Sequence, residues 1–437
     1  MKQKLQTLFD KNNIKLTVLN SAYILFLIAL FLKLIVEIFQ TYSYESWEGS
    51  EWLINYQGGY VRRGLIGEIL FFFAKYFNIN IAWALKIFAL ICLFSVAVFF
   101  VRSFLKQGYS LYILPLSFFM GTHIINSMFW QKRDHLMFLF LIATFWAFTK
   151  INKGYVKILI VNVLLIIAFQ VHEVLAFFSL PILYLLFFNE YRNKGIFQSI
   201  ALSFIFLLPG IFSFLLTLRY HGDLEIAQAI WDSWVAVSNM EAAELTEYSH
   251  SAVSALGWTS EWAFKYHFES NFLSTDMRIS SFVFWSMTFL LVYYIVTNAL
   301  LVFRKKENIF TNHDKNILSS VLIFQLICLT PVFLVLSCDL GRVIFYWVAS
   351  SFVIFLLIPK SKIERLFPLF FLKFIEKINN IFINIISPTK TTLVLLMMFI
   401  GVPTAGFRFS VVITSSAIYN ILLTLSAPLH FFNEFIF

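Results

Sequence analysis

Charged residues are scarce in this sequence. Asp, Glu, Lys and Arg make up 13% of the 437 residues, whereas soluble domains contain about 25%. Hydrophobic residues account for 60% of the chain, and the mean hydropathy is +0.80. So little charge cannot cover the surface of a soluble domain. The composition predicts an all-α polytopic membrane protein, with a single integral membrane domain over residues 1–437.

Cysteine is also rare, and the familiar chemical motifs are missing. Cys92, Cys328 and Cys338 show no spacing typical of a disulfide framework or a zinc site. The sequence contains no P-loop, nucleophile elbow, HExxH zinc motif or dinucleotide fingerprint in a meaningful context. Internal repeats and low-complexity tracts are absent as well. We therefore expect no bound cofactor and no metal.

The net charge of +9 would suit a nucleic-acid partner, but the positions of the cations do not. Lys and Arg lie between apolar segments rather than along one soluble face, so they are better explained as topology signals. We expect membrane lipid to be a partner of this chain and nucleic acid not to be one.

Twelve apolar runs are long enough to cross a bilayer, allowing for tilt. The first follows a basic N-terminus, and no small-residue cleavage site comes after it, which predicts a retained helix rather than a signal peptide. Twelve crossings place both termini on the same side. The runs are 16–39, 81–101, 110–129, 135–149, 155–171, 174–188, 197–217, 280–303, 317–337, 343–358, 391–407 and 411–431.

The charges between the runs orient the chain. With the N-terminus inside, the inner segments are rich in Lys and Arg, as at Lys150, Lys153 and Arg304. The outer segments, above all 218–279, are acidic. This distribution agrees with the positive-inside rule. We therefore expect cytoplasmic N- and C-termini.

Four segments need a separate interpretation. The run 64–78 is short and charged, which predicts a re-entrant or interfacial half-helix. Residues 218–279 predict a large external loop with short helices. Residues 360–390 mix apolar residues with Lys and Arg and predict a helix in the cytoplasmic interface. The segment 155–188 is interpreted as two helices, with one long helix as the alternative because no Gly or Pro marks a turn.

Short polar clusters interrupt the apolar chain, each at the edge of a run or between two runs. A charge at such depth costs roughly 2.5–3.5 kcal/mol, so these clusters are candidates for a function. The predicted topology puts all of them on the outer side, which indicates one shared site. They are 58–64, 131–135, His172–Glu173 and 339–342.

The first cluster is suited to an anion. Arg62 and Arg63 stand between Gly59 and Gly64, and glycines let a backbone approach a ligand closely. Adjacent guanidinium groups bind phosphate oxygens with two N–H groups each. The alternative is that both arginines anchor the chain at the membrane interface.

The next two clusters have equally simple alternatives. Arg133 and Asp134 open a predicted helix, where Asp134 would also serve as a cap or pair with Arg133. His172 and Glu173 lie between two apolar runs. Either would serve as a general base, or both would form hydrogen bonds between helices.

The last cluster and the first outer loop complete the candidate residues. Asp339 and Arg342 are three residues apart, so they bind a ligand together or only form a local ion pair. Gly341 lies between them, and Arg408 falls at the same predicted depth. The outer loop holds three acids with the spacing of one helix face, which solvent exposure is enough to explain. These are Glu45, Glu48 and Glu51.

The arrangement resembles the polymerases of bacterial O-antigen and capsule repeat units, the Wzy type. The resemblance lies in the many spans, the large external loop and the external arginines, and it covers most of the chain. It implies a GT-C-like fold in the bacterial cytoplasmic membrane, with an active site facing the periplasm. The pattern that carries it is Tyr56-x-x-Gly59-x-x-Arg62-Arg63-Gly64-Leu65-x-Gly67, Lys132-Arg133-Asp134, His172-Glu173 and Asp339-x-Gly341-Arg342.

The resemblance also implies a reaction and its partners. A growing glycan on undecaprenyl diphosphate is the donor, and a single lipid-linked repeat unit is the acceptor. Arginines would stabilise the leaving diphosphate, and a base would accept the proton of the attacking hydroxyl. A chain-length regulator protein is a further implied partner. The expected diphosphate ligands are Arg62, Arg63, Arg133, Arg342 and Arg408, the candidate bases Glu173, Asp339 and His172, and the supporting residues Gly59, Gly64, Asp134 and Gly341.

Three other functions stay open at this point. A flippase for lipid-linked oligosaccharides would need polar groups along a path through the membrane, and here they stay at one end. A GT-C glycosyltransferase with a polyprenyl-monophosphate sugar donor would use the acids of the first outer loop. A membrane acyltransferase would use His172 as its base.

Overall fold

The fold is built from helices. The computed structural model describes residues 11–39, 46–114, 130–246, 249, 251–269, 278–304, 311–337, 339–400, 416, 418, 419 and 422. Within these ranges there is no β-strand, only an isolated antiparallel bridge between Tyr109 and Arg304. The predicted all-α class is therefore confirmed for the described part of the chain.

Seven helices in these ranges are long and apolar enough to cross a membrane. At 1.5 Å per residue they match a hydrocarbon layer about 30 Å thick. Two more helices, α17 (Leu369–Ile385) and α18 (Lys390–Phe399), meet at 91° and add an eighth span if they form one broken crossing. The seven are α2 (Lys11–Phe39), α5 (Ile81–Lys106), α8 (Gly154–Val171), α10 (Ile196–Arg219), α13 (Arg278–Val302), α14 (Asn312–Pro331) with η7 (Val332–Leu336), and α15 (Leu340–Leu357).

A helical membrane protein is thus supported, but the count of twelve spans is not confirmed. Helices α7 (Asp134–Lys150) and α9 (Leu175–Tyr191) occupy two predicted runs, but with 17 residues each they are shorter than the seven. The runs 110–129 and 411–431 lie largely outside the described residues. The run 391–407 is described only up to residue 400.

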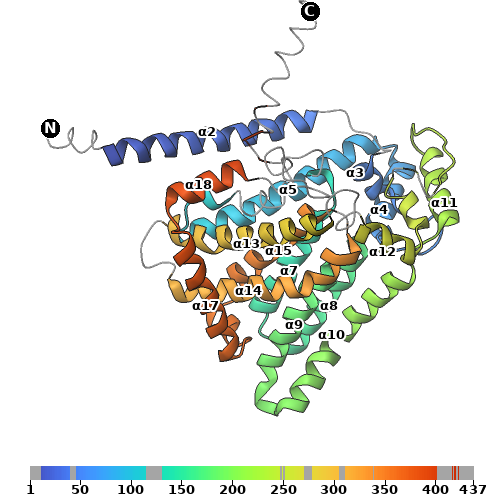
Figure 1. Ribbon diagram of the computed structural model, residues 1–437. Helices are drawn as coiled ribbons and strands as arrows, with labels where there is room; N and C mark the ends of the chain where they lie inside the picture. Colours follow the sequence, from blue (N-terminus) through green and yellow to red (C-terminus); the bar gives the residue numbers. More distant parts are fainter. Residues whose placement is uncertain are drawn as a thin grey trace, which may run out of the picture.

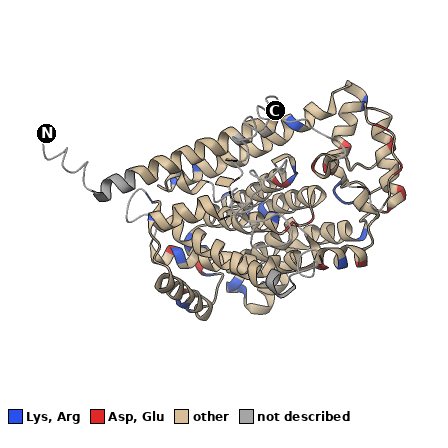
Figure 2. Ribbon diagram, turned by 45° about the horizontal axis from the view of Figure 1, so that its top comes forward, with Lys and Arg blue, Asp and Glu red and all other residues tan. Residues whose placement is uncertain are grey.

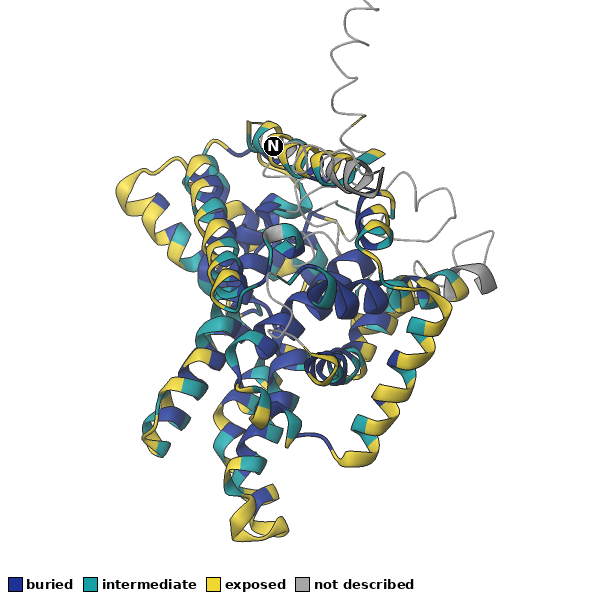
Figure 3. Ribbon diagram, turned by 90° about the vertical axis from the view of Figure 1, so that its left-hand side faces the viewer, coloured by how far each residue is buried: buried dark blue, intermediate teal, exposed yellow. Residues whose placement is uncertain are grey.

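Helix α15 lies at the centre of the bundle. Nearly all of its residues are buried, and a helix buried on every side is apolar all round. Helices α7 and α14 pack directly against it, while α8, α9 and α10 pack against one another. Figure 3 shows buried residues gathered in the middle and exposed residues on the peripheral helices. Large apolar side chains such as Leu159 and Phe197 are among those exposed, as in a chain surrounded by lipid.

Helix α10 contains a proline, and the neighbouring helix compensates for it. Pro209 has no N–H group, and its ring disturbs the hydrogen bonds of the preceding turn. The Asn162 side chain of α8 donates to the Phe206 carbonyl at 2.7 Å and accepts from the Gly210 N–H at 3.0 Å. Such a bond satisfies backbone groups that lipid cannot. It also fixes α8 against α10.

The two ends of the bundle differ. Helices α3 (Trp47–Ser50), α4 (Gly64–Phe77), α11 (Leu224–Val235) and α12 (Ser260–Phe268) lie together at one end, and α17 lies at the other (Figure 1). Short 3-10 turns occur at η1 (Glu51–Leu53), η2 (Leu111–Ile113), η4 (Arg192–Lys194) and η5 (Ser254–Gly257), and α16 spans Lys360–Glu364. Most of the ribbon between the ends carries no charge (Figure 2).

The segment 155–188 forms two helices, which confirms one prediction and rejects the single-helix alternative. Helix α8 ends at Val171 because His172 takes an extended conformation, with φ −161° and ψ 114°. Helix α9 then starts at Leu175. The predicted helix at 64–78 is present as α4, and the predicted external loop contains α11 and α12. Their positions relative to a membrane stay predictions.

Candidate functional site

Charged and polar side chains from four distant parts of the chain meet at one place in the fold. They come from the first loop, the start of α7, the junction of α8 with α9, and the start of α15. The predicted gathering of the polar clusters is therefore observed. We call this set the charged cluster: Glu48, Glu51, Arg62, Arg63, Lys132, Arg133, Asp134, His172, Glu173, Asp339 and Arg342.

A buried ion pair joins Arg342 to Asp134. The guanidinium donates from Nε and Nη2 to the two carboxylate oxygens at 2.7 and 2.6 Å. Tyr346, one turn further along α15, donates its hydroxyl to Oδ1 of Asp134 at 2.7 Å. Asp134 is the first residue of α7, one position after the N-cap residue Arg133, and its carboxylate accepts hydrogen bonds from Arg342 and Tyr346.

A second bidentate ion pair joins Arg63 to Glu173. Arg63 donates from Nε and Nη2 to the carboxylate at 2.8 and 2.6 Å, and Arg62 adds a longer bond at 3.4 Å. Burial would raise the pKa of Glu173, but Arg63 and Arg62 hold it well below its usual range. With both oxygens engaged, Glu173 is a weak base in this arrangement.

The backbone at Arg63 is held in an unusual conformation. Its φ is +64°, the left-handed region that costs a residue with a side chain about 1–2 kcal/mol. Arg133 donates from Nη1 to the Arg63 carbonyl at 2.6 Å, and the ion pair with Glu173 fixes the side chain. Backbone strain of this kind concentrates at functional sites.

Glu51 lies at the centre of the cluster and is fully buried. Its Oε1 is 3.2 Å from Nη2 of Arg342 and 3.7 Å from Nη1 of Arg63. Burial would raise the pKa of Glu51, but Arg342 and Arg133 lower it to about 2. The prediction that Glu51 belongs to a solvent-exposed helix face is therefore wrong. Glu45 lies outside the described residues.

Arg133 is a buried cation with unused donors. Its side chain is inaccessible to solvent, and Nε and Nη2 have no hydrogen-bond partner in the described part of the chain. The guanidinium lies over the Trp52 ring, 5.9 Å from its centroid. Burial lowers the pKa of Arg133 to about 10, opposed by Glu51. A buried donor without a partner costs about 1–3 kcal/mol, so these nitrogens are suited to an incoming acceptor.

Asp339 marks the more open side of the cluster. Lys132 donates from Nζ to Oδ2 of Asp339 at 3.1 Å, and Glu48 lies 3.9 Å from the same ammonium. Arg342 is 3.9 Å from Asp339, so each partner of the predicted local pair has a closer partner elsewhere. The Asp339 side chain is 23% exposed, and that of Arg62 is 29% exposed. Gly341 is buried in the first turn of α15.

His172 is buried between the two ion pairs. The Val174 N–H lies 3.3 Å from Nδ1 of the ring, and Nη2 of Arg342 lies 3.4 Å from Nε2. Burial and the nearby Arg63 lower the pKa of His172 to about 3, so the ring is neutral near pH 7. Each ring nitrogen thus faces an N–H donor, and Nδ1 also lies 3.7 Å from Oε2 of Glu173.

The glycines bring the first loop onto α4. A Cβ at Gly64 would overlap the Tyr56 ring, and one at Gly67 would overlap the Ile54 carbonyl. The close approach at Gly64 is therefore to the protein itself. Gly59 has a φ of +121°, a conformation that favours glycine.

The charged cluster is balanced in sign, which the sequence did not predict. Its five cations, Arg62, Arg63, Lys132, Arg133 and Arg342, face five acids, Glu48, Glu51, Asp134, Glu173 and Asp339. It is thus no simple basic pocket. Arg133 and Arg62 are the members with buried nitrogens that no described acceptor satisfies. Arg408 lies outside the described residues.

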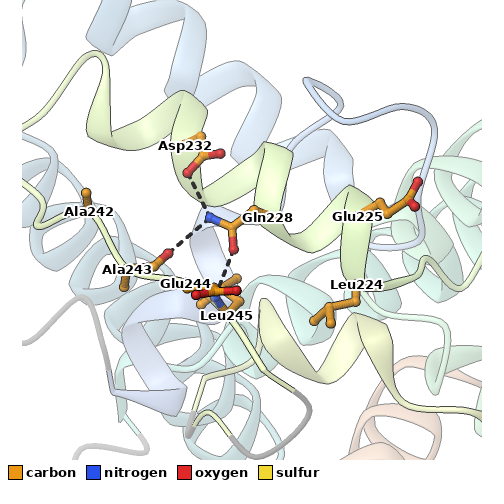
Figure 4. A pocket seen from close by; sticks show the side chains of 8 residues that line it. All are labelled: Leu224, Glu225, Gln228, Asp232, Ala242, Ala243, Glu244 and Leu245. Carbon is orange, nitrogen blue, oxygen red and sulfur yellow. Dashed lines mark hydrogen bonds between the residues drawn. The ribbon is translucent and has the colours of Figure 1, made fainter.

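Other features do not compete with this cluster. A hollow of about 500 Å³ between α11 and the segment 242–245 is lined by Gln228 and three acids, and Gln228 bridges Asp232 to the Ala243 carbonyl (Figure 4). It contains no cation. Across the described residues, no group of three or more His, Cys, Asp or Glu side chains is arranged to hold a metal ion.

The residues that sequence reasoning missed lie around the predicted ones. Tyr346 donates to Asp134, the partner of Arg342, and the charges of Asp339 and Arg62 act on His267 of α12. Comparison of the chain with protein-family models, with curated proteins and with solved structures finds no match.

Proposed function

We propose that this chain is a membrane glycosyltransferase whose donor is a glycan on a polyprenyl diphosphate. The proposed reaction is the joining of lipid-linked repeat units into a surface polysaccharide, as in Wzy-type polymerases, at the outer face of a bacterial cytoplasmic membrane. The observation that carries the proposal is Arg133, a fully buried guanidinium with two unpartnered nitrogens beside carboxylates. Buried donors aimed at a developing anion are what a phosphate leaving group requires.

The reaction balances with the groups present. The acceptor hydroxyl forms a bond to the anomeric carbon of the donor, and the bond from that carbon to the diphosphate oxygen breaks. The electron pair leaves with the diphosphate, which Arg133 and Arg62 would stabilise. The hydroxyl proton passes to a carboxylate. No metal takes part in this scheme.

Asp339 is the best placed base among the predicted candidates. Its Oδ2 is held by Lys132, while the side chain keeps 23% of its surface accessible. Glu173 has both oxygens bound to arginines, and His172 is buried behind them. A base must reach the proton that it accepts, which favours the accessible carboxylate.

The test is deletion of the gene followed by complementation. Cells without the protein should lose the long polysaccharide ladder on gels but still carry one repeat unit on the acceptor. Wild type and the control Arg219→Ala, an exposed arginine at the end of α10, should restore the ladder. Arg133→Ala should not. Complete loss of surface glycan on deletion would favour a flippase and contradict the proposal.

One observation favours a second candidate, a glycosyltransferase with a polyprenyl-monophosphate sugar donor. That reading expects a catalytic acid in the first outer loop, and Glu51 is a buried acid from this loop with one unpartnered oxygen, Oε2. The two candidates differ in the donor that the purified protein consumes. A supplied monophosphate-linked sugar that is consumed by wild type but not by Glu51→Gln would support the second.

A further inference from the structure

The external helix α12 carries a stack of aromatic side chains. Trp262 and Tyr266 lie one turn apart, with ring centroids 5.1 Å apart and planes inclined by only 7°. Trp258 meets Trp262 edge-on at 4.5 Å, and Trp47 of α3 lies 5.7 Å from Trp258. We call these four residues the aromatic platform. Tyr266 is 41% exposed, so the platform is open to a ligand.

The aromatic platform is continuous with the open side of the charged cluster. Trp47 is followed by Glu48, which lies 3.9 Å from Lys132, and Lys132 in turn holds Asp339. Helix α12 also packs against η7, the segment that leads into Asp339. In Figure 1, α12 is drawn at the same end of the bundle as α3 and α4. A molecule that contacts Asp339 from the open side therefore has aromatic rings within reach.

His267 joins the aromatic rings to the charges. Its ring lies 5.7 Å from Tyr266 and 6.3 Å from Trp258. Nδ1 of His267 is buried and has no hydrogen-bond partner among the described residues. Burial lowers the pKa of His267 to about 4, against the influence of Asp339, so the ring is neutral near pH 7. A neutral imidazole offers one donor and one acceptor, which matches a hydroxyl group.

We propose that the aromatic platform and His267 bind the sugar next to the reacting hydroxyl of the acceptor glycan. This inference rests on the proposed function and adds a binding site to it. A pyranose ring has a face of C–H groups with slight positive charge, which packs on the negative face of an aromatic ring. Its hydroxyl groups point sideways and need hydrogen-bond partners. The platform supplies the rings, and His267 supplies the partner.

The composition of α12 favours a sugar over a membrane surface as the occupant. Its sequence is SEWAFKYHF, with Ser260, Glu261, Lys265 and His267 between the aromatic residues. None of its residues is fully buried. A helix that dips into a bilayer has a wide apolar face and a strongly cationic opposite face, whereas this helix carries an acid and a base on a mixed surface.

The test measures glycan binding by the full chain in nanodiscs. The probe is the repeat-unit oligosaccharide, freed from its lipid by mild acid. Trp262→Ala and Tyr266→Ala should each weaken binding about tenfold, which corresponds to loss of one stacking partner, and Trp262→Phe should retain most of the affinity. The control is Trp146→Ala, an exposed tryptophan on α7. Unfolding temperatures show whether each variant is folded.

The outcomes separate this inference from the proposed function. If wild-type protein extends glycan chains and both alanine variants of α12 bind the oligosaccharide as tightly as wild type, the platform proposal alone is overturned. Loss of part of the quenching by brominated phospholipids in Trp262→Phe would identify a membrane anchor and overturn it too. Arg133→Ala should stop chain extension and still bind the free oligosaccharide. Wild-type protein that neither extends nor binds would overturn both proposals.

Discussion

Arg342 and Asp134, 208 residues apart, form a buried ion pair with two parallel hydrogen bonds of 2.7 and 2.6 Å. Each residue also has a second contact, Arg342 with Glu51 and Asp134 with Tyr346. The pair therefore connects the starts of α7 and α15 to the first loop. Removing Arg342 alone takes a cation from two buried carboxylates, Asp134 and Glu51, whereas removing Arg342 together with Asp134 takes it from Glu51 only.

We expect Arg342→Ala to destabilise the protein by about 3–5 kcal/mol, because Asp134 and Glu51 would stay buried without their cation. The double variant Arg342→Met, Asp134→Leu should be more stable than Arg342→Ala. Thermal unfolding in detergent measures both. Arg219→Ala, at an exposed site, is the control and should unfold like wild type. Equal unfolding temperatures for Arg342→Ala and the control would contradict this account.

Arg133→Met should separate stability from activity. Its two unpartnered nitrogens cost free energy in the folded state, while its Nη1 bond to the Arg63 carbonyl stabilises that state. These effects oppose each other, so the unfolding temperature should change little. Chain extension should fall by about 100-fold or more, as for loss of a donor to a developing anion. A variant with full activity would show that Arg133 does not serve the leaving group.

Asp339→Asn should reduce kcat by about 100-fold to 10,000-fold with little change in KM, because an amide cannot accept the proton. Lys132 can still donate to the amide oxygen, so folding should be kept. Single-turnover extension of a lipid-linked repeat unit measures the effect. The comparison is Glu173→Gln, which should mainly lower the unfolding temperature by unpairing Arg63. The reverse pattern would assign the base to Glu173.

The stability of the protein should depend on pH through His172. The pKa of this residue is lowered to about 3 in the folded state, below about 6.5 in the unfolded chain. Between these values the unfolded state binds more protons, so stability rises with pH and is fully present above about 6.5. His172→Gln should flatten the dependence of unfolding temperature on pH between 6.5 and 3. The same pH dependence in wild type and His172→Gln would contradict this account.

Glycan extension should persist in excess chelator, because arginines take the role of a divalent ion in the proposed scheme. The measurement is extension with EDTA, followed by addition of Mg²⁺ or Mn²⁺. Activity that disappears with EDTA and returns with one of these ions would refute the metal-free scheme.

The sequence was sufficient to predict the long helices and the gathering of the polar clusters in one place. Apolar runs predicted the long helices because helix length follows bilayer thickness. The positive-inside rule predicted the break between α8 and α9, because one long helix would have put Arg304 on the outer side. The number of membrane spans was harder to predict from the sequence. Runs such as 135–149 form helices near the minimum length, where hydropathy does not distinguish a span from a shorter helix.

The pairing within the cluster was not predictable from spacing. Asp339 and Arg342 suggest a local pair, but Asp134 gives Arg342 a better two-pronged geometry. Glu51 belongs to a set of acids with the spacing of a solvated helix face. Its partners Arg342 and Arg63 lie 291 and 12 residues further along the chain. Only the tertiary structure distinguishes a buried acid from an exposed one at such a position. His267 gave no signal because its neighbours Asp339 and Arg62 are remote in sequence.

The contact between Glu51 and Arg342 across 291 residues has a consequence for biogenesis. A polytopic chain enters the membrane in the order of its synthesis, so Glu51 and Asp134 are in place long before the ribosome reaches α15. Until then these acids must stay hydrated, and the site closes only when a late helix arrives. A nascent chain truncated after residue 337 is therefore expected to be removed by quality-control proteases faster than the full chain, which pulse-chase labelling would measure.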